Sequence, residues 1–259
     1  MRKLTFLGTG HGMPKRSAGS AFFLSDGSSK LLMDCAGGYE IIARLHSANI
    51  GRNDLTNIFI THHDSDHILG IVPLMRLLSK TDQKVNLYCN SETLSAIESL
   101  FTFVAKKHWE LAQSNLNIVV VEGGQKVQLN DWELEFIDTG KKVPMLGVKV
   151  TFPDGYKLVY PGDEPIYQSY EDALRSVDML LLEAFCLSKD EAQYDPHGKN
   201  HSTVKESAAK AQELGVKHLA LIHMEDDTLE TRKVEYAREA SSVFSGEVTV
   251  PVDLDEVEF

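Results

Sequence analysis

The sequence predicts an α/β protein with two mixed β-sheets, each covered by helices, in a four-layer αββα sandwich. Three observations lead to this prediction. Segments with the composition of strands fall into two groups, one in each half of the chain. Segments with apolar residues at helical spacing accompany both groups. Nothing typical of a linker, a low-complexity segment or a repeat separates the halves, so we expect one domain over residues 1–259.

In the first half, short apolar runs predict strands and longer runs with helical spacing predict helices. Gly51 is typical of a helix end and closes the first expected helix. The expected strands span residues 5–7, 21–24, 30–34, 57–61 and 85–88, and the expected helices span 38–50, 67–80 and 91–107.

The second half repeats this mixture of elements. Pro153-Asp154-Gly155 is a good turn and predicts that its two flanking strands pair. Thr203 and Glu206 form a capping box that opens an alanine-rich helix, which Gly215 ends. The expected strands span 117–121, 132–137, 146–152, 156–160, 178–183 and 218–223.

Composition places the chain among globular proteins of a reducing compartment. Hydrophobic residues make up 42% and charged residues 25%, and no apolar run approaches the ~18 residues that cross a bilayer. The first residues lack the features of a secretory signal, and three scattered cysteines indicate no disulfide framework. We therefore expect a cytoplasmic protein. The net charge of -12 repels phosphate backbones and argues against a long nucleic-acid substrate.

The segment Thr61 to His67 is the strongest chemical signal in the chain. It places His62, Asp64, Asp66 and His67 between an expected buried strand and an expected helix. Imidazole and carboxylate are the ligands that zinc, manganese and iron take in proteins. A solvated polar loop is the alternative, but such a cluster favours a metal site.

This segment resembles the signature of the metallo-β-lactamase superfamily, T-H-x-H-x-D-H after a strand. His62, Asp66 and His67 stand at matching positions, whereas Asp64 stands where the second histidine is expected. The variant H-x-D-x-D-H-x-x-G, residues 62–70, also resembles the hydrolase domain of bacterial competence DNA-uptake channels. The resemblance implies the metallo-β-lactamase sandwich.

Further segments resemble the ribonuclease Z-like branch of that superfamily. They are Phe6 to Gly10 with Pro14, Arg16 and Ser20, Leu32 to Cys35, Tyr160 to Asp163, Leu221 to His223, and Val250 to Leu254. The opening glycines alone could suggest a dinucleotide loop, but Pro14 stands where that motif needs a helix. The resemblance implies that Asp34 supports the metal loop. It also implies a second metal site of Asp66, His67, Asp163 and His223.

Two more segments resemble phosphodiesterases of the same branch. Asn200-His201-Ser202-Thr203 matches their H-S-T box, and Leu181-Leu182-Glu183-Ala184 matches the strand whose glutamate orients that histidine. The resemblance implies that His201, oriented by Glu183, faces a phosphate. A capping or surface histidine and a buried structural acid are the alternatives.

The first metal site departs from the branch. Lys141, in Lys141-Lys142-Val143-Pro144, stands where its third histidine is expected, beside His62 and Asp64. An ammonium group has no lone pair for a metal, so we expect an Asp64–Lys141 ion pair to replace the first ion. In the alternative, Lys141 and Lys142 face solvent. We expect one tightly bound ion, zinc before manganese or iron, and a second ion stays open.

Together these signals predict a metal-dependent phosphodiesterase acting on a small or short nucleotide-type substrate. Asp66 would ligate the metal and orient a metal-bound hydroxide. His201, oriented by Glu183, would stabilise the phosphate. Residues 87–121 contain no long glycine- and proline-rich arm of the kind that grips transfer RNA, which argues against that substrate. A hydrolase of lactones or thioesters and a non-catalytic metal-binding protein are the alternatives. A homodimer stays open, and no membrane association is expected.

Overall fold

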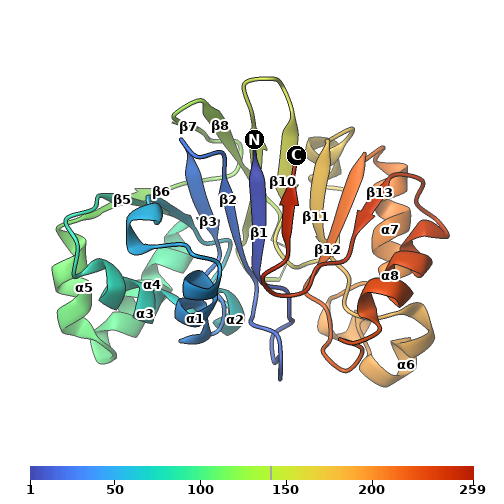
Figure 1. The fold of residues 1–259 in the computed structure, drawn as a ribbon, viewed down its shortest axis with the longest axis horizontal. Coiled ribbons are helices and arrows are strands. Elements are labelled where there is room, and N and C mark those ends of the chain that lie inside the picture. The colour runs from blue at the N-terminus through green and yellow to red at the C-terminus, as the bar shows by residue number, and fades with distance from the viewer. Residues whose placement is uncertain (141) are drawn as a thin grey trace. The chain divides into compact units, whose positions relative to one another are not determined.

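The computed structural model describes residues 1–140 and 142–259. The chain forms two compact units. Unit 1 comprises Met1–Val121 and Asp253–Phe259, and unit 2 comprises Glu122–Val252. Over the described residues, each unit contains one seven-stranded mixed sheet with its own helices (Figure 1).

The sheet of unit 1 has the strand order β14-β1-β2-β3-β4-β5-β6. The strands from β14 to β3 pair antiparallel, and those from β3 to β6 pair parallel. Parallel strands end at the same edge of a sheet, so the residues that follow β3 and β4 lie close together. The strands are β1 (Lys3–Gly8), β2 (Ala21–Ser25), β3 (Lys30–Met33), β4 (Asn57–Phe59), β5 (Val85–Cys89), β6 (Leu116–Val120) and β14 (Glu256–Glu258).

The helices of unit 1 are shorter than the sequence predicts. The expected helix 67–80 is two helices, because Gly70 approaches the backbone of Cys35 so closely that a Cβ there would collide with its carbonyl oxygen. The expected helix 91–107 also breaks, at Ala105, whose φ of 58° is left-handed. The helices are α1 (Glu40–Ser47), α2 (Ser65–Ile68), α3 (Ile71–Leu78), α4 (Ser91–Phe103) and α5 (Lys106–Gln113), with a 3₁₀ turn at Arg52–Asp54.

The sheet of unit 2 has the strand order β13-β12-β11-β10-β9-β8-β7. The strands from β7 to β10 pair antiparallel, and those from β10 to β13 pair parallel. The carboxyl ends of β10, β11 and β12 therefore share one edge. The strands are β7 (Lys126–Leu129), β8 (Trp132–Asp138), β9 (Leu146–Thr151), β10 (Lys157–Tyr160), β11 (Met179–Glu183), β12 (His218–Ile222) and β13 (Glu247–Thr249).

Unit 2 also contains α6 (Glu191–Tyr194), α7 (Val204–Glu213) and α8 (Arg232–Ser241). In Figure 1, α7 and α8 lie side by side next to β12 and β13. Three 3₁₀ turns complete the described elements of this unit, at Glu171–Leu174, Ser188–Asp190 and His197–Lys199.

Each unit buries its own hydrophobic core. Leu32, Ile58 and Ile71 are fully buried in unit 1, and Leu180 and Leu219 are fully buried in unit 2. Two mixed sheets with helices confirm the predicted α/β class. The expectation of one domain over residues 1–259 stays a prediction. Among the described residues, none of the helices combines the length and the apolar character needed to cross a bilayer.

Candidate metal centre

In unit 1 the metal motif follows β4, at the edge where β3 also ends. Asp34, the first residue after β3, is fully buried and has a φ of 58°. Its Oδ1 accepts a hydrogen bond from the Thr61 amide at 2.8 Å, and its Oδ2 accepts one from the Thr61 hydroxyl at 2.9 Å. Asp34 thus fixes the start of the motif, which is the supporting role that the resemblance implies.

Asp34 also fixes His67. The Nδ1 of His67 lies 2.7 Å from Asp34 Oδ2, and because a carboxylate only accepts, Nδ1 donates. This hydrogen bond leaves Nε2 as the lone-pair nitrogen of a fully buried imidazole. The Nε2 atom lies 3.2 Å from Oδ2 of Asp66. Two ligand atoms of one tetrahedral zinc ion lie about 3.3 Å apart, so this pair fits a single ion.

His62 and Asp64 adjoin this pair. The buried ring of His62 lies 4.2 Å from the ring of His67, measured between centroids, and its Nδ1 lies 2.9 Å from the Thr61 hydroxyl. The Oδ2 of Asp64 lies 3.6 Å from Nε2 of His62, and the Asp64 side chain is 55% exposed. Lys141, its expected partner, lies outside the described residues.

In unit 2 a second acid–imidazole pair lies at the shared edge of β10 and β12. Asp163 follows β10 after Pro161-Gly162, and Gly162 has a φ of 102° beside Met145, whose sulfur a Cβ would meet. His223 follows β12 in a left-handed conformation, with a φ of 54°. Both side chains are buried, and His223 Nε2 lies 3.5 Å from Asp163 Oδ2. Unit 2 thus offers the same donor types as unit 1.

A second imidazole of unit 2, that of His201, lies beside this pair. Its ring centroid is 4.7 Å from that of His223. Its Nδ1 donates to the backbone carbonyl of Asp163 at 3.0 Å, and its ring stacks on Phe185 with centroids 5.2 Å apart and planes 4° apart. The Asp163 carbonyl therefore holds one edge of the His201 ring, and Phe185 covers one of its faces.

Glu183 acts on His201 less directly than the sequence predicts. Its Oε2 lies 3.7 Å from His201 Nδ1, beyond hydrogen-bond distance, while its two oxygens accept from the Ser202 amide at 2.9 and 3.1 Å. Burial raises the pKa of Glu183 well above its usual range, and the Ser202 hydrogen bond opposes this shift. Glu183 therefore holds the backbone next to His201, while the Asp163 carbonyl accepts the hydrogen bond from the His201 ring.

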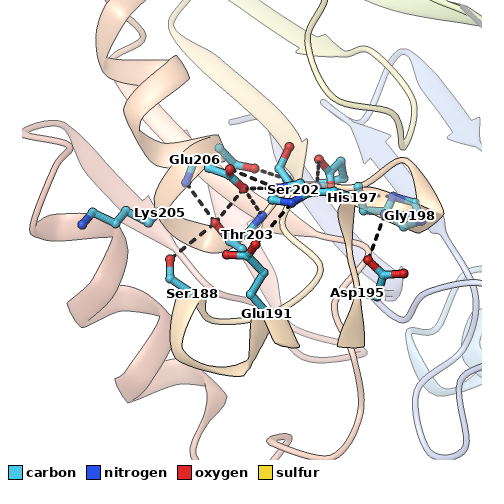
Figure 2. Close-up of polar contacts among 12 residues, drawn as sticks. Ser188, Glu191, Asp195, His197, Gly198, Ser202, Thr203, Lys205 and Glu206 are labelled. Atoms are coloured by element: carbon cyan, nitrogen blue, oxygen red, sulfur yellow. Dashed lines mark hydrogen bonds and ion pairs between the residues drawn. The ribbon is translucent and has the colours of Figure 1, made fainter. Parts of the chain in front are cut away.

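The predicted capping box fixes the segment after His201 (Figure 2). The Glu206 carboxylate accepts from the amide and the hydroxyl of Thr203, both at 2.8 Å. His197 Nε2 lies 3.0 Å from each Glu206 oxygen, and this contact raises the pKa of His197. The start of α7 is therefore tied to the loop that precedes His201.

Two residues with structural roles, one in each unit, were not found from the sequence. Phe185 of unit 2 is the ring that stacks on His201, and its place two residues after Glu183 was the only available signal. Asp253 accepts from the amides of Thr9 and Ala18, at 3.0 and 2.7 Å, and pairs with Arg44 at 2.9 Å. It closes the N-terminal loop that lines a cleft of about 450 Å³ beside Asp66.

The chemistry of the donor sets fits a divalent transition metal. Each unit presents a buried carboxylate beside a buried imidazole, which are the oxygen and nitrogen ligands of zinc, manganese and iron. The hydrogen bond from His67 to Asp34 is the outer contact that metal-binding imidazoles usually make.

The sequence matches the profile of a family described as beta-lactamase superfamily domain over residues 30–224, which is more than half of the 259 residues. The chain belongs to the β-lactamase superfamily.

Relatives and solved structures of the superfamily agree with this assignment. A protein named ribonuclease Z from Metallosphaera sedula is 28% identical, with 98% of each chain covered. The metallo-β-lactamase fold protein YhfI from Bacillus subtilis superposes with a TM-score of 0.80 at 22% identity, covering 100% of this chain and 99% of that one. Human tRNase Z, short form, superposes with a TM-score of 0.77 at 20% identity, covering 99% and 98%.

These comparisons confirm three predictions. The chain has the metallo-β-lactamase fold, it has ribonuclease Z-like relatives, and it is a metal-dependent hydrolase. Membership of the superfamily implies a divalent metal, in agreement with the donor sets. The printed names of these relatives are ribonuclease Z and tRNase Z, whereas the sequence argued against transfer RNA as a substrate of this chain.

Proposed function

We propose that this hydrolase cleaves phosphodiester bonds in small or short nucleotide-type substrates, with one divalent ion held by Asp66, His67, Asp163 and His223. The observation that carries the proposal is His201, an imidazole next to a candidate ligand pair and yet held outside it by the Asp163 carbonyl and Phe185. A proton-transfer or anion-binding group needs this independence from the metal.

In this proposal the two units form a single domain around the ion. The bound ion, zinc in our expectation, would polarise the phosphate and lower the pKa of water. Asp66 and His67 would hold it from unit 1, with Asp34 keeping His67 Nε2 available. Asp163 and His223 would hold it from unit 2. Asp66 would in addition orient the attacking water.

His201 would act on the phosphate. Because its Nδ1 proton is engaged by the Asp163 carbonyl, the second ring nitrogen, Nε2, is the atom that would carry a proton to a phosphate or leaving oxygen. Glu183, through Ser202, would set the position of the His201 backbone. His62 and Asp64 would flank the ion without ligating it.

The cleft beside Asp66 supports an anionic substrate. Lys15, Arg16 and Arg44 line it against the two carboxylates of Glu40 and Asp66, so cations outnumber acids there in a chain whose net charge is -12. Between β5 and β6 the chain forms α4 and α5, joined at Val104 and Ala105, which supports a short substrate. The ribonuclease Z name of the relatives supports RNA phosphodiesters as the alternative within the same chemistry.

A cytoplasmic location belongs to the same proposal. Among the described residues, Cys35, Cys89 and Cys186 are buried free thiols. Free thiols are typical of reducing compartments.

The test compares substrates of different chemistry. Purified protein loaded with Zn²⁺, Mn²⁺ or Fe²⁺ is given bis-p-nitrophenyl phosphate, p-nitrophenyl acetate, a lactone, a cyclic nucleotide and a precursor transfer RNA. We expect cleavage of bis-p-nitrophenyl phosphate and of the cyclic nucleotide. His201→Ala should lower this rate by about 100-fold or more while metal content stays unchanged. Turnover confined to the acetate or the lactone contradicts the proposal, and preferential cleavage of the transfer RNA contradicts the substrate class.

A further inference from the structure

A cluster of buried polar side chains lies directly behind His223 in unit 2. Glu225, Asp226, Arg232 and Tyr236 are each at most 4% exposed. Glu225 and Asp226 belong to the turn after β12, and Arg232 and Tyr236 lie one turn apart on α8. The superfamily match ends at residue 224, so the whole cluster lies beyond it.

Two contacts of this cluster meet at one backbone group, the carbonyl of Phe185, while the Glu225 carboxylate also accepts from the amides of Asp227 and Thr228. The Glu225 amide donates to it at 2.9 Å. The Tyr236 hydroxyl lies 3.3 Å from the same oxygen and 3.0 Å from Glu225 Oε1, so its one proton is shared between two acceptors. Arg232 Nη2 donates to the Glu225 carbonyl and lies 3.5 Å from Asp226 Oδ1.

Phe185 connects these hydrogen bonds to His201 through two contacts of its own. Its ring stacks on the His201 ring, and its amide donates to the Ser202 carbonyl at 2.9 Å. On the other side, Glu225 is two residues from His223, whose left-handed backbone needs neighbours that hold it. The cluster therefore contacts both Phe185, whose ring stacks on His201, and the turn that carries His223.

The chemistry of the cluster argues against a purely stabilising role. Within the described residues, Nε and Nη1 of Arg232 are buried and have no hydrogen-bond partner. Buried charges with incomplete hydrogen bonding cost free energy, and apolar side chains of similar volume stabilise a core at least as well. What apolar side chains cannot do is hold a carbonyl oxygen in one place.

We propose that Tyr236 and Glu225, with Arg232 behind them, are positioning residues that fix the Phe185 carbonyl and thereby hold His201 at its distance from His223. The inference rests on the proposed function of His201 and His223. The α8 helix then positions His201 through Phe185, although none of the α8 residues is proposed to touch substrate.

Tyr236→Phe tests this positioning role because it removes one hydroxyl and keeps the ring. We expect kcat for bis-p-nitrophenyl phosphate to fall about tenfold, KM to stay within about twofold, and metal content to stay unchanged. The matched control is Thr249→Val, which removes the 2.8 Å contact with His218 Nε2 at the opposite end of β12. This control should leave kcat unchanged.

A coupling measurement follows the path through Phe185. Phe185→Leu removes the ring beneath His201, and we expect the Phe185→Leu/Tyr236→Phe double variant to be no slower than Phe185→Leu alone. Multiplying effects in the double variant, or equal losses of kcat in Tyr236→Phe and Thr249→Val, would overturn the proposal.

A second readout does not depend on activity. Nitrogen-15 NMR of the metal-free protein reports the imidazole environments of His201 and His223 separately. We expect Tyr236→Phe to shift both sets of signals and Thr249→Val to shift neither. If the wild type cleaves no phosphodiester while these shifts occur, the proposed function fails and the positioning stands. Unshifted signals in Tyr236→Phe overturn the positioning role itself.

Discussion

At the scale of single residues, Asp34 shows how a side chain outside the proposed ligand set can govern it. The carboxylate is fully buried and engages both Thr61 and His67. With this acceptor in place, the His67 ring keeps one orientation and presents one nitrogen. Outer contacts of this kind raise the basicity of a ligating imidazole as well as orienting it.

We expect Asp34→Asn to lower metal affinity by about 10- to 100-fold, because the amide is a weaker acceptor for the His67 Nδ1 proton. Competition against a chromogenic chelator measures this affinity. Asp54→Asn is the matched control, since Asp54 is another carboxylate of unit 1. It accepts a hydrogen bond from Lys30 Nζ at 2.7 Å and does not belong to the metal motif. Equal affinity in wild type and Asp34→Asn would show that Asp34 only stabilises the fold.

The candidate site could be read from the sequence where its members are neighbours along the chain. His62, Asp66 and His67 lie within six residues, so their composition alone indicates a metal site. The hydrogen bond from His201 Nδ1 goes instead to a backbone carbonyl, that of Asp163, which lies 38 residues away. Every residue has such a carbonyl, so residue types carry no signal for this contact.

At the scale of elements, the sequence located most strands and helices but not their interruptions. Gly70 divides a helix because the chain must pass close to Cys35. This close approach depends on the tertiary structure, so the local sequence does not predict it. The short strands β13 and β14 were missed because each has only three residues and depends on its partner for stability. The α8 helix was missed because its surface is mostly polar.

The start of α7 gives a prediction about pH. His197 faces Glu206 of α7, Glu191 of α6 and the neighbouring Asp195, and the hydrogen bond with Glu206 raises its pKa. A raised pKa in the folded state means that this pair stabilises the fold fully below the unfolded pKa of about 6.5. The stabilisation is lost as pH rises through the raised value.

We therefore expect wild type to be more stable than His197→Gln at about pH 5 and equally stable at about pH 9. Urea unfolding over this range measures the difference. His46→Gln, an exposed position of α1, serves as the control and should give a difference that does not depend on pH. A His197→Gln difference that is constant, or that grows with pH, would show that His197⁺ does not support α7.

At the scale of the whole molecule, the two halves of the sequence correspond closely to the two units. The last residues, Asp253–Phe259, are the exception and belong to unit 1. There β14 pairs with β1, and Asp253 holds the loop between Thr9 and Ala18. Pairing between residues some 250 positions apart leaves no local pattern, so the sequence did not predict it, although residues 250–254 resemble the closing segment of the ribonuclease Z-like branch.

The proposed ligands of the metal come equally from both units. We expect one tightly bound ion per chain by elemental analysis, and a lower Tm after chelation. An ion that binds only the folded chain stabilises it by about 2.7 kcal/mol at a free concentration 100 times its Kd. Because Asp66 and His67 belong to one unit and Asp163 and His223 to the other, either pair alone should bind weakly.

Variants from each unit decide between a joint centre and a local one. His67→Ala and His223→Ala should each abolish the metal-dependent rise in Tm, whereas the exposed control His46→Ala should keep it. If only one of them does so, the ion lies within a single unit. Replacing both Asp64 and Lys141 by His should raise the content toward two ions, since it restores the histidines that the superfamily resemblance leads us to expect there. Two ions in the wild type would instead mean that Asp64 is a ligand and that no Asp64–Lys141 ion pair fills the first site.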